Sequence, residues 1–458
     1  MRIQPPGPSG VPFLGNVGQY ARGPFDFLTE VADAYGDVAR FELGPLETYL
    51  LTNPKDIERV LVSQDAKFGK PDFQEGALGD LVGDGLLIGD GETWQRQRQL
   101  AQPAFHPKRI EALGDRIAHH AREMCDDWAA GDLRDINEEM TKVTVRIIVS
   151  VIFGAELTDD RIERIQESLE PIVRRFEPDP VRVLVPDWAP TRDNRDYRES
   201  IRTIEGVIDE ILAERAGTEH DPSVDSASDA VGPSDQPTDL VSILLRARDR
   251  GEQTDGQLRD ELMTILLAGH ETTALALSYT WYLLSTHPSA ASRVHAELAA
   301  VCGDDPPTPA DVREFEYTER VLQEGMRLYP PVYAIFRQPK VDVRLAGYRI
   351  PKGTAIMMPQ WVVHRSDRWY DDPDAFDPDR WLPKRRAERP QFAYFPFGGG
   401  PRHCIGKHLA LLESKLILGT IAQAYELEAV RDQLPPLRGS LTMHPDEPIG
   451  MRIRERAD

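Results

Sequence analysis

One cysteine near the end of the chain has surroundings that sharply restrict its chemistry. Cys404 lies in the segment Phe397-Gly-Gly-Gly-Pro-Arg-His-Cys-Ile-Gly406, where glycines offer backbone N–H groups and Arg402 offers positive charge. Both features favour a thiolate over a thiol. An apolar, helix-like run starts at Lys407, so the sulfur is expected near a helix N-terminus. This pattern indicates an axial ligand for haem iron, and a buried structural cysteine in a glycine turn is the alternative.

A second motif lies on a long apolar helix predicted over residues 257–284, and it reads Ala-Gly-His-Glu-Thr-Thr from Ala268. Ala268 and Gly269 are small, which lets the helix approach a flat cofactor. Thr272 offers a hydroxyl to bound oxygen, and Glu271 can relay protons as a general acid. Considered alone, paired threonines on a helix more often serve packing.

Both motifs resemble those of the cytochrome P-450 family. The pattern F-x-x-G-x-R-x-C-x-G matches the family's haem-binding loop, and A-G-x-E-T matches its oxygen-activating helix. Three further family patterns occur in the family's order, so the resemblance covers nearly the whole chain from Pro5 onward. It implies a mostly α-helical fold with small β-sheets, formed by a single domain over residues 1–458 around an embedded haem b. Cys404 is then the implied iron ligand.

The resemblance also assigns residues to the haem propionates. Trp94 and Arg98 match the W-x-x-x-R pair, whose i, i+4 spacing places two donors on one helix face. Arg337 and Arg402 match two further propionate positions, and Lys70 is a weaker candidate. The haem-binding residues implied by the family are Trp94, Arg98, Ala268, Gly269, Arg337, Phe397, Arg402, Cys404 and Gly406.

Three charged residues match a structural triad of the family. Glu324 and Arg327 form an E-x-x-R pair, and Arg380 follows in a Phe-Asp-Pro-Asp-Arg-Trp segment. Charged pairs at i, i+3 are ordinarily solvated surface features. The resemblance instead implies a locked core behind the cysteine loop, which holds the haem without taking part in chemistry.

The implied activity is that of a monooxygenase that inserts one atom of O2, with Glu271 and Thr272 as catalytic residues. A peroxide-driven haem enzyme is one alternative, although such members tend to replace this pair. A haem-thiolate sensor without turnover is another, although no signalling domain is evident. Matching pocket positions are apolar and favour a lipophilic substrate, a long-chain lipid or an isoprenoid. Besides Ala268, these positions are Phe73, Leu86, Leu87, Ile88, Val332, Tyr333, Ala334, Ile335, Leu441 and Met443.

Electrons are expected from a separate ferredoxin or flavodoxin with its reductase, because no flavin domain follows Cys404. Basic residues near the expected thiolate side of the haem favour docking of an acidic carrier. These residues are Arg96, Arg98, Lys108, Arg109, Arg402 and Lys407.

The formal net charge of −22 makes nucleic acid and anionic membranes poor partners. Three widely spaced cysteines argue against a disulfide framework and favour a reducing cytoplasm. The proline-rich N-terminus offers no signal peptide or membrane anchor, so a soluble, cytoplasmic, microbial protein is expected. Only 10 of the 54 basic residues are lysines, which favours a halophilic protein. Arginine codons in a GC-rich genome are the alternative explanation.

Hydrophobic periodicity predicts mainly helices with a few short strands. The predicted helices span 110–130, 138–153, 160–176, 198–215, 257–284, 317–328 and 407–425. The predicted strands span 38–43, 47–51, 341–345, 348–350 and 355–359. Residues 216–239 are rich in Ser, Asp, Pro and Gly and are predicted to form a disordered surface loop within the single domain.

Overall fold

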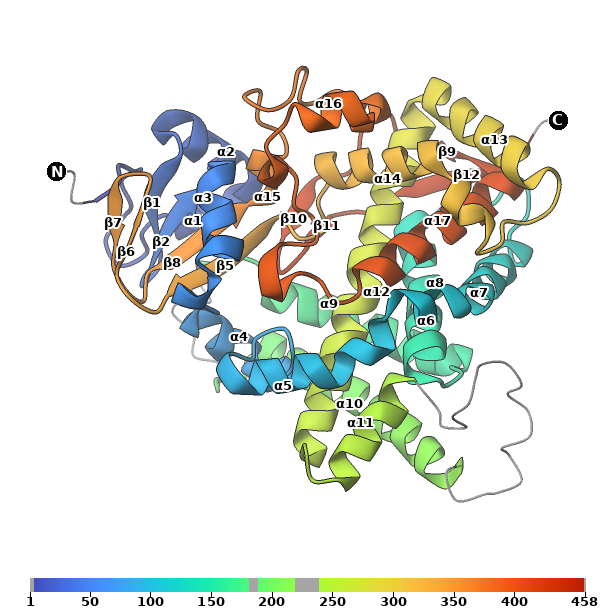
Figure 1. The fold of residues 1–458 in the computed structure, drawn as a ribbon, viewed down its shortest axis with the longest axis horizontal. Coiled ribbons are helices and arrows are strands. Elements are labelled where there is room, and N and C mark those ends of the chain that lie inside the picture. The colour runs from blue at the N-terminus through green and yellow to red at the C-terminus, as the bar shows by residue number, and fades with distance from the viewer. Residues whose placement is uncertain (1–3, 181–187, 219–238, 457–458) are drawn as a thin grey trace.

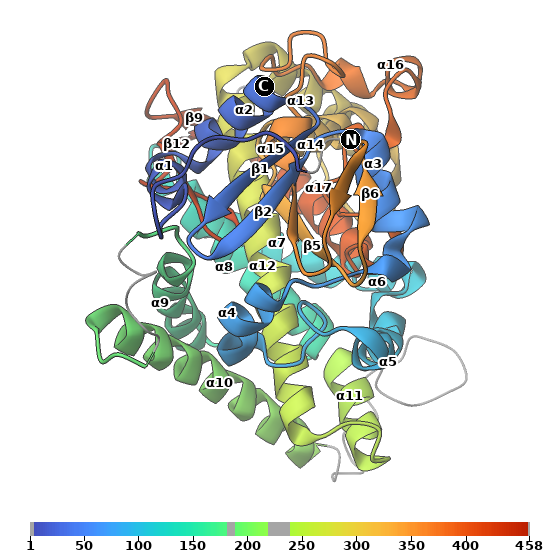
Figure 2. The ribbon, with the colours of Figure 1, turned by 90° about the vertical axis from the view of Figure 1, so that its left-hand side faces the viewer.

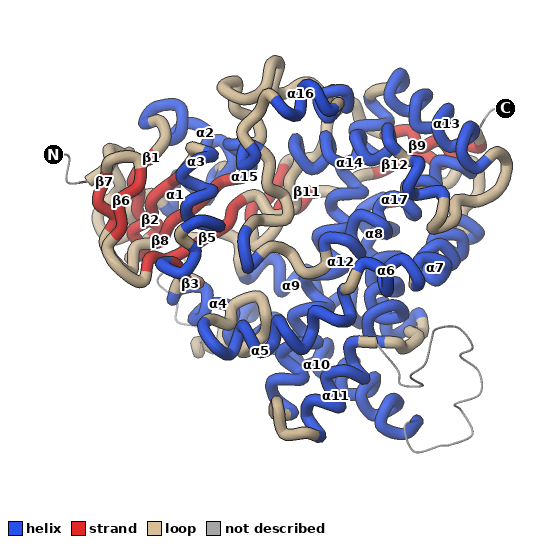
Figure 3. The backbone as a smooth tube through the Cα atoms, viewed as in Figure 1, coloured by secondary structure: helices blue, strands red, loops and turns tan. Residues whose placement is uncertain are grey.

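A computed structural model describes residues 4–180, 188–218 and 239–456 of the chain. Helices make up most of the molecule, and the main sheet lies on the side where the chain begins (Figure 1). Strands β9 and β12 lie on the far side, near the C-terminus (Figure 3). The expected mostly helical architecture with small sheets is therefore confirmed.

The helices fall into an N-terminal group, a central group and a C-terminal group. The bounds are α1 Val17–Arg22, α2 Pro24–Tyr35, α3 Pro54–Glu58, α4 Asp72–Val82, α5 Gly91–Ala101, α6 Pro107–Ala112, α7 Gly114–Asp126, α8 Ile136–Ile148, α9 Asp159–Arg175, α10 Arg192–Thr218, α11 Leu240–Asp249, α12 Asp255–Thr286, α13 Pro288–Cys302, α14 Glu316–Leu328, α15 Gln360–Val363, α16 Pro383–Ala387 and α17 Lys407–Ala424. Short 3-10 and π-helical turns extend several of them, including the π-helical turn Val149–Phe153 after α8.

The main sheet has the strand order β1-β2-β8-β5-β3, in which β2 and β8 pair in parallel and the other neighbours pair antiparallel. Two hairpins, β6-β7 and β10-β11, and a small sheet of β4, β12 and β9 complete the strands of the described residues. The strand bounds are β1 Val38–Leu43, β2 Leu46–Leu51, β3 Phe68–Gly69, β4 Leu133–Asp135, β5 Ala334–Pro339, β6 Val343–Leu345, β7 Tyr348–Ile350, β8 Ala355–Pro359, β9 Tyr425–Ala429, β10 Leu437–Gly439, β11 Met443–Pro445 and β12 Gly450–Glu455.

Helix α12 is the central element of the fold. Thr254 and Gln257 form a capping box at its start, in which each side chain accepts a hydrogen bond from the other's backbone N–H. Most of the helix is buried, and it contacts α8, α10, α14 and α17. Figure 2 shows α12 running the length of the molecule, with α9 and α10 side by side below the main sheet. Within the described residues, no helix is long and apolar enough to cross a membrane.

Three sequence expectations differ from the structure. The helix predicted over 110–130 is interrupted at Leu113, so that α6 and α7 are separate and α7 ends at Asp126. The loop predicted over 216–239 begins too early, because α10 continues to Thr218. Residues 219–238 of that loop lie outside the described residues, and Asp239 caps α11 by accepting the Ser242 N–H. Strand β5 was expected only as pocket lining, although its residues pair with β8 and β3.

Candidate active site

The backbone of the cysteine loop is shaped by glycines. Gly398 and Gly400 have φ angles of 68° and 66°, the left-handed region that L side chains rarely adopt. At Gly400 a Cβ atom would also lie 1.8 Å from the Leu61 carbonyl oxygen, so only glycine fits there. The Cys404 N–H donates to the Phe397 carbonyl (2.9 Å) and closes the loop just before α17. The glycine run therefore fixes where the cysteine stands.

Cys404 is the only exposed cysteine of the three, all of which lie in the described part of the chain. Enough protein surrounds its sulfur for desolvation to raise the thiol pKa, while the Gly406 N–H, Arg98 and Lys407 act in the opposite direction. Burial raises the pKa of Cys125 to about 12 and that of Cys302 to about 11, so both stay protonated. Of the three cysteines, only Cys404 has cationic neighbours that favour its thiolate.

Trp94 and Arg98, on α5, contact the cysteine loop in different ways. The Arg98 guanidinium donates to the His403 carbonyl (3.0 Å) and so lies one residue from Cys404. Trp94 instead lies under the guanidinium of Arg402, 4.3 Å from its ring centroid. Arg402 also donates to the Gly89 carbonyl (2.9 Å). The predicted residues are thus brought together around the loop.

A group of buried cations lies beside this loop. Arg337 on β5 is 6% exposed, and burial, with Arg402 nearby, lowers its pKa to about 10. Burial, followed by repulsion from Arg337 and Arg402, lowers the pKa of Lys70 well below its usual value. Asp90 forms its ion pairs with Arg402 and Lys340, and no carboxylate of the described residues forms one with Lys70 or Arg337. Buried cations without counter-ions are unfavourable, so this group fits an anionic ligand.

The donor set suits a haem group. The thiolate of Cys404 is a ligand type that iron accepts in haem proteins. Arg98, Arg337, Arg402 and Lys70 match the two carboxylates that a haem carries, and charge-assisted pairs of this kind are strong. The residues present therefore fit the cofactor expected from the sequence.

On α12, the small residues have two different roles. Ala268 is exposed, as a residue facing a flat ligand should be. At Gly269, a Cβ would lie 2.8 Å from Ile148 Cδ1, so this glycine allows α8 to approach α12. Helix packing therefore explains Gly269 physically, and its predicted contact with the cofactor stays a prediction. The Thr272 hydroxyl donates to the Ala268 carbonyl (3.0 Å) within the same helix.

Glu271 has a partner that sequence reasoning missed. His444, on β11, places Nε2 3.1 Å from Glu271 Oε1. Burial raises the pKa of Glu271, but the hydrogen bond and charge of His444, assisted by His270 and Thr442, lower it overall. The only available signal was the alternation in the segment Leu-Thr-Met-His, in which Leu441 and Met443 were assigned to the pocket and the polar residues were passed over.

The predicted pocket residues differ in exposure. Leu87 and Leu441 are exposed, while Phe73, Leu86, Val332 and Ile335 are half-buried and Ile88 and Ala334 are buried. Two of them pack inside the protein. Tyr333 is buried against Phe25, and its hydroxyl lies 2.8 Å from that of Tyr20, while Met443 is fully buried in the core. Both are therefore core residues here, since a tyrosine hydroxyl and an unbranched thioether are satisfied within the packed interior.

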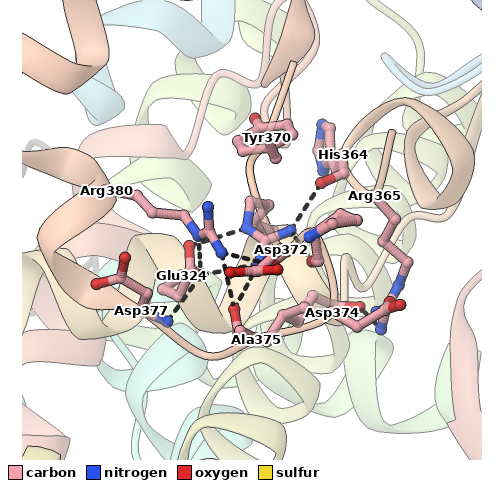
Figure 4. A network of polar contacts seen from close by, with 12 residues as sticks. Glu324, His364, Arg365, Tyr370, Asp372, Asp374, Ala375, Asp377 and Arg380 are labelled. Carbon is pink, nitrogen blue, oxygen red and sulfur yellow. Dashed lines mark hydrogen bonds and ion pairs between the residues drawn. The ribbon is translucent and has the colours of Figure 1, made fainter. Parts of the chain in front are cut away.

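The charged triad is a buried network between α14 and the segment after β8 (Figure 4). Glu324 Oε1 accepts from Arg327 (2.8 Å) and Arg380 (3.2 Å), and Oε2 accepts from Arg327 (2.9 Å) and Trp381 (3.0 Å). Arg327 also donates to the carbonyls of His364, Pro373 and Ala375. All three charges are thus paired and hydrogen-bonded, unlike a solvated surface pair.

The predicted docking residues lie on neighbouring elements, because α6 contacts α17 and a short turn joins α5 to α6. Arg96, Lys108 and Lys407 are exposed, while Arg109 is half-buried. Arg98 and Arg402 are engaged in the contacts described above. The exposed positive charge of this face is therefore carried chiefly by the first three residues, here named the basic face.

A family model described as Cytochrome P450 matches residues 5–450. The chain is 32% identical to "Cyclooctatin synthase" of Streptomyces melanosporofaciens, over 96% of this chain and 95% of that protein. It is 32% identical to "Cyclooctat-9-en-7-ol 5-monooxygenase" of the same organism, over 92% and 89% of the two chains. It is 29% identical to "Pentalenene oxygenase" of Streptomyces avermitilis, over 96% and 94%.

Proposed function

Because the chain belongs to the cytochrome P450 family, we propose that it inserts one atom of O2 into a hydrophobic terpenoid, with Cys404 as its iron ligand. The enzyme is a P450 monooxygenase, an oxidoreductase, and the family's cofactor is haem b held by a cysteine. The observation that carries the assignment of Cys404 is its exposed sulfur beside Arg98, Lys407 and the Gly406 N–H. When bound, a thiolate-ligated haem supplies oxygen activation.

Residues around the loop would hold and orient the cofactor. Arg337 and Lys70, which lack carboxylate partners among the described residues, are suited to bind its propionates. Arg98 reaches the same region from α5, and Arg402 is held over Trp94. Their charges would balance the propionates and the thiolate, which removes the penalty of burying unpaired cations.

Glu271 and Thr272 would move protons to the reacting oxygen. The Glu271 carboxylate is partly exposed and can exchange protons with water. The Thr272 hydroxyl is bonded only within its helix, so it can turn to accept one proton and donate another. This acid–alcohol pair supports O2 and external electrons over peroxide as the oxidant source.

The substrate class is inferred from relatives and from exposed apolar residues. Three relatives are named for cyclooctatin, cyclooctat-9-en-7-ol and pentalenene, which points to the isoprenoid side of the expected lipophilic substrates. Leu87, Ala268 and Leu441 are exposed apolar residues on three separate elements. A ferredoxin or flavodoxin, reduced by its own reductase, would supply the electrons at the basic face.

Two measurements test the proposal. The reduced protein treated with carbon monoxide should give the thiolate-haem spectrum, and Cys404→Ser should lose it while Cys125→Ser and Cys302→Ser keep it. The wild-type enzyme should then convert a cyclic terpene with reduced carrier and O2. Product formed equally well with peroxide and no carrier would instead identify a peroxide-driven enzyme.

A further inference from the structure

A histidine from the C-terminal hairpin binds the carboxylate of Glu271. His444 Nε2 lies 3.1 Å from Glu271 Oε1 and 2.7 Å from Thr442 Oγ1, so one nitrogen serves two oxygens. The exposed fractions of the two side chains are 12% for His444 and 22% for Glu271. Partial burial makes the contact stronger than a surface ion pair, because less water screens it.

The hairpin that carries His444 is fixed in place. The Tyr279 hydroxyl of α12 donates to the Met443 carbonyl (2.6 Å), and the Met443 N–H donates to the Pro331 carbonyl (2.9 Å). In the β10-β11 pair, His444 stands opposite Arg438. Since the backbone on either side of His444 is held, the imidazole meets Glu271 at a defined point of α12.

We propose that His444 is a positioning residue for Glu271, which it holds ionised and turned toward β11, and whose release it controls. The proposal rests on the proton-relay role proposed above for Glu271.

The other charges near this contact do not account for it. On α12 itself, His270 adds a smaller attraction to Glu271, and its own Nδ1 lies 2.6 Å from the Leu266 carbonyl. On β10, Arg438 forms ion pairs with Glu170, Glu177 and Asp446. Within the described residues, no lysine or arginine forms an ion pair with Glu271. Without His444, the burial that raises the pKa of Glu271 would therefore prevail.

The contact also directs Glu271 away from its neighbour. Successive residues of an α-helix point about 100° apart, so Glu271 and Thr272 do not face each other. The Thr272 hydroxyl is committed to the Ala268 carbonyl. A proton passes from Glu271 toward Thr272 only after the carboxylate leaves His444. A neutral imidazole holds a carboxylate less firmly than a charged one, and histidine is the side chain that ordinarily changes charge near neutral pH.

Three variants at position 444 separate position from charge. His444→Ala removes the contact, His444→Lys keeps a cation that does not change charge near neutral pH, and His444→Gln keeps a neutral donor. His119→Ala, at an exposed histidine of α7, is the matched control.

The first readout does not depend on turnover. Carboxyl-13C glutamate is titrated by NMR in the diamagnetic ferrous carbon monoxide form, and Glu271→Gln identifies the Glu271 signal. Its midpoint should lie below the ordinary glutamate range in the wild type, His444→Lys and His119→Ala, and above that range in His444→Ala. An unchanged midpoint in His444→Ala would overturn the proposal.

The second readout is product formed per reduced nicotinamide between pH 6 and pH 8.5. The wild-type yield should rise with pH as His444 releases Glu271, and this dependence should disappear in both His444→Lys and His444→Ala. The lysine variant should stay at the low wild-type yield and the alanine variant at the high one. Equal pH dependence in all variants would contradict control by His444. A wild type that oxidises no terpene while the NMR result holds would instead refute the proposed function alone.

Discussion

The imidazole of His364 accepts a hydrogen bond from the backbone N–H of Phe395 (3.0 Å), with Nε2 as the acceptor. The His364 carbonyl, in turn, accepts from Arg327 of the buried triad (2.9 Å). Phe395 lies two residues before Phe397, whose carbonyl receives the Cys404 N–H. His364 therefore joins the triad to the cysteine loop through a short series of hydrogen bonds.

This bond makes stability depend on pH in one direction. Burial, followed by repulsion from Arg327, lowers the pKa of His364 to about 3, whereas an unfolded histidine titrates near 6.5. Between these values the unfolded state binds the extra proton, so the stabilisation is complete above about pH 6.5 and is lost as pH falls toward 3, by about 1.4 kcal/mol per unit. Urea unfolding from pH 4 to 7 should show a shallower slope in His364→Gln than in the wild type. The exposed His106→Gln serves as control, and a slope equal to wild type in His364→Gln would contradict the assignment.

Glu324→Ala should leave two buried guanidinium groups without their carboxylate. Removing one partner of a buried ion pair destabilises a protein by roughly 3–5 kcal/mol, a large part of a typical folding free energy. We expect a much lower yield of haem-loaded protein and a lower melting temperature. Glu316→Ala, at an exposed position of the same helix, should behave as wild type. Equal haem content in the two variants would show that the triad does not support cofactor binding.

Strong periodicity made the long helices predictable. α12 and α17 were placed within two residues, because an apolar face repeated over many turns fixes both the type and the extent of a helix. The turn at Ala346-Gly347 was found because both residues adopt positive φ between short strands. β5 was missed because its partners β3 and β8 come from distant segments, and strand pairing of that kind leaves no local pattern.

The site divides along the same line. Cys404, Glu271 and the Glu324 triad were found because each belongs to a motif compact in sequence. His444 and His364 were missed because each is an isolated histidine whose partner lies on another element. Tyr333 was assigned to the pocket from its place in the chain, and only the fold reveals its hydroxyl beside that of Tyr20.

Thr272→Val should uncouple electron consumption from product formation. The substitution keeps the shape of the side chain and removes the hydroxyl that would pass a proton to the reacting oxygen. Product per reduced nicotinamide should fall several-fold and hydrogen peroxide should rise, while the carbon monoxide spectrum stays unchanged. Thr273→Val, at the buried neighbour that bonds the Gly269 carbonyl (3.4 Å), should retain normal coupling. Equal coupling in both variants would assign Thr272 to packing.

Reversing charge on the basic face should slow electron delivery. Arg96→Glu and Lys108→Glu replace exposed cations with acids that repel an acidic carrier, and rim charges act mainly on association rates. The apparent association rate should fall about tenfold or more at low salt and much less at high salt. Lys352→Glu, on the exposed turn before β8, should have no comparable effect. A rate independent of both salt and these charges would point to an apolar docking surface.

The net charge of −22 should make the fold more stable in concentrated salt than in dilute buffer. Repulsion among carboxylates extends over about 10 Å at 0.1 M salt but only about 3 Å at 1 M. Salt also weakens the surface ion pairs, but exposed pairs contribute only about 0–1 kcal/mol each, so the excess charge is expected to prevail. The melting temperature should therefore rise from 0.05 M to 2 M potassium chloride, with equal osmolarities of glucose as the control for excluded-solute effects. A melting temperature that stays flat or falls in salt would remove the halophilic interpretation and leave codon preference as the explanation for the abundance of arginine over lysine.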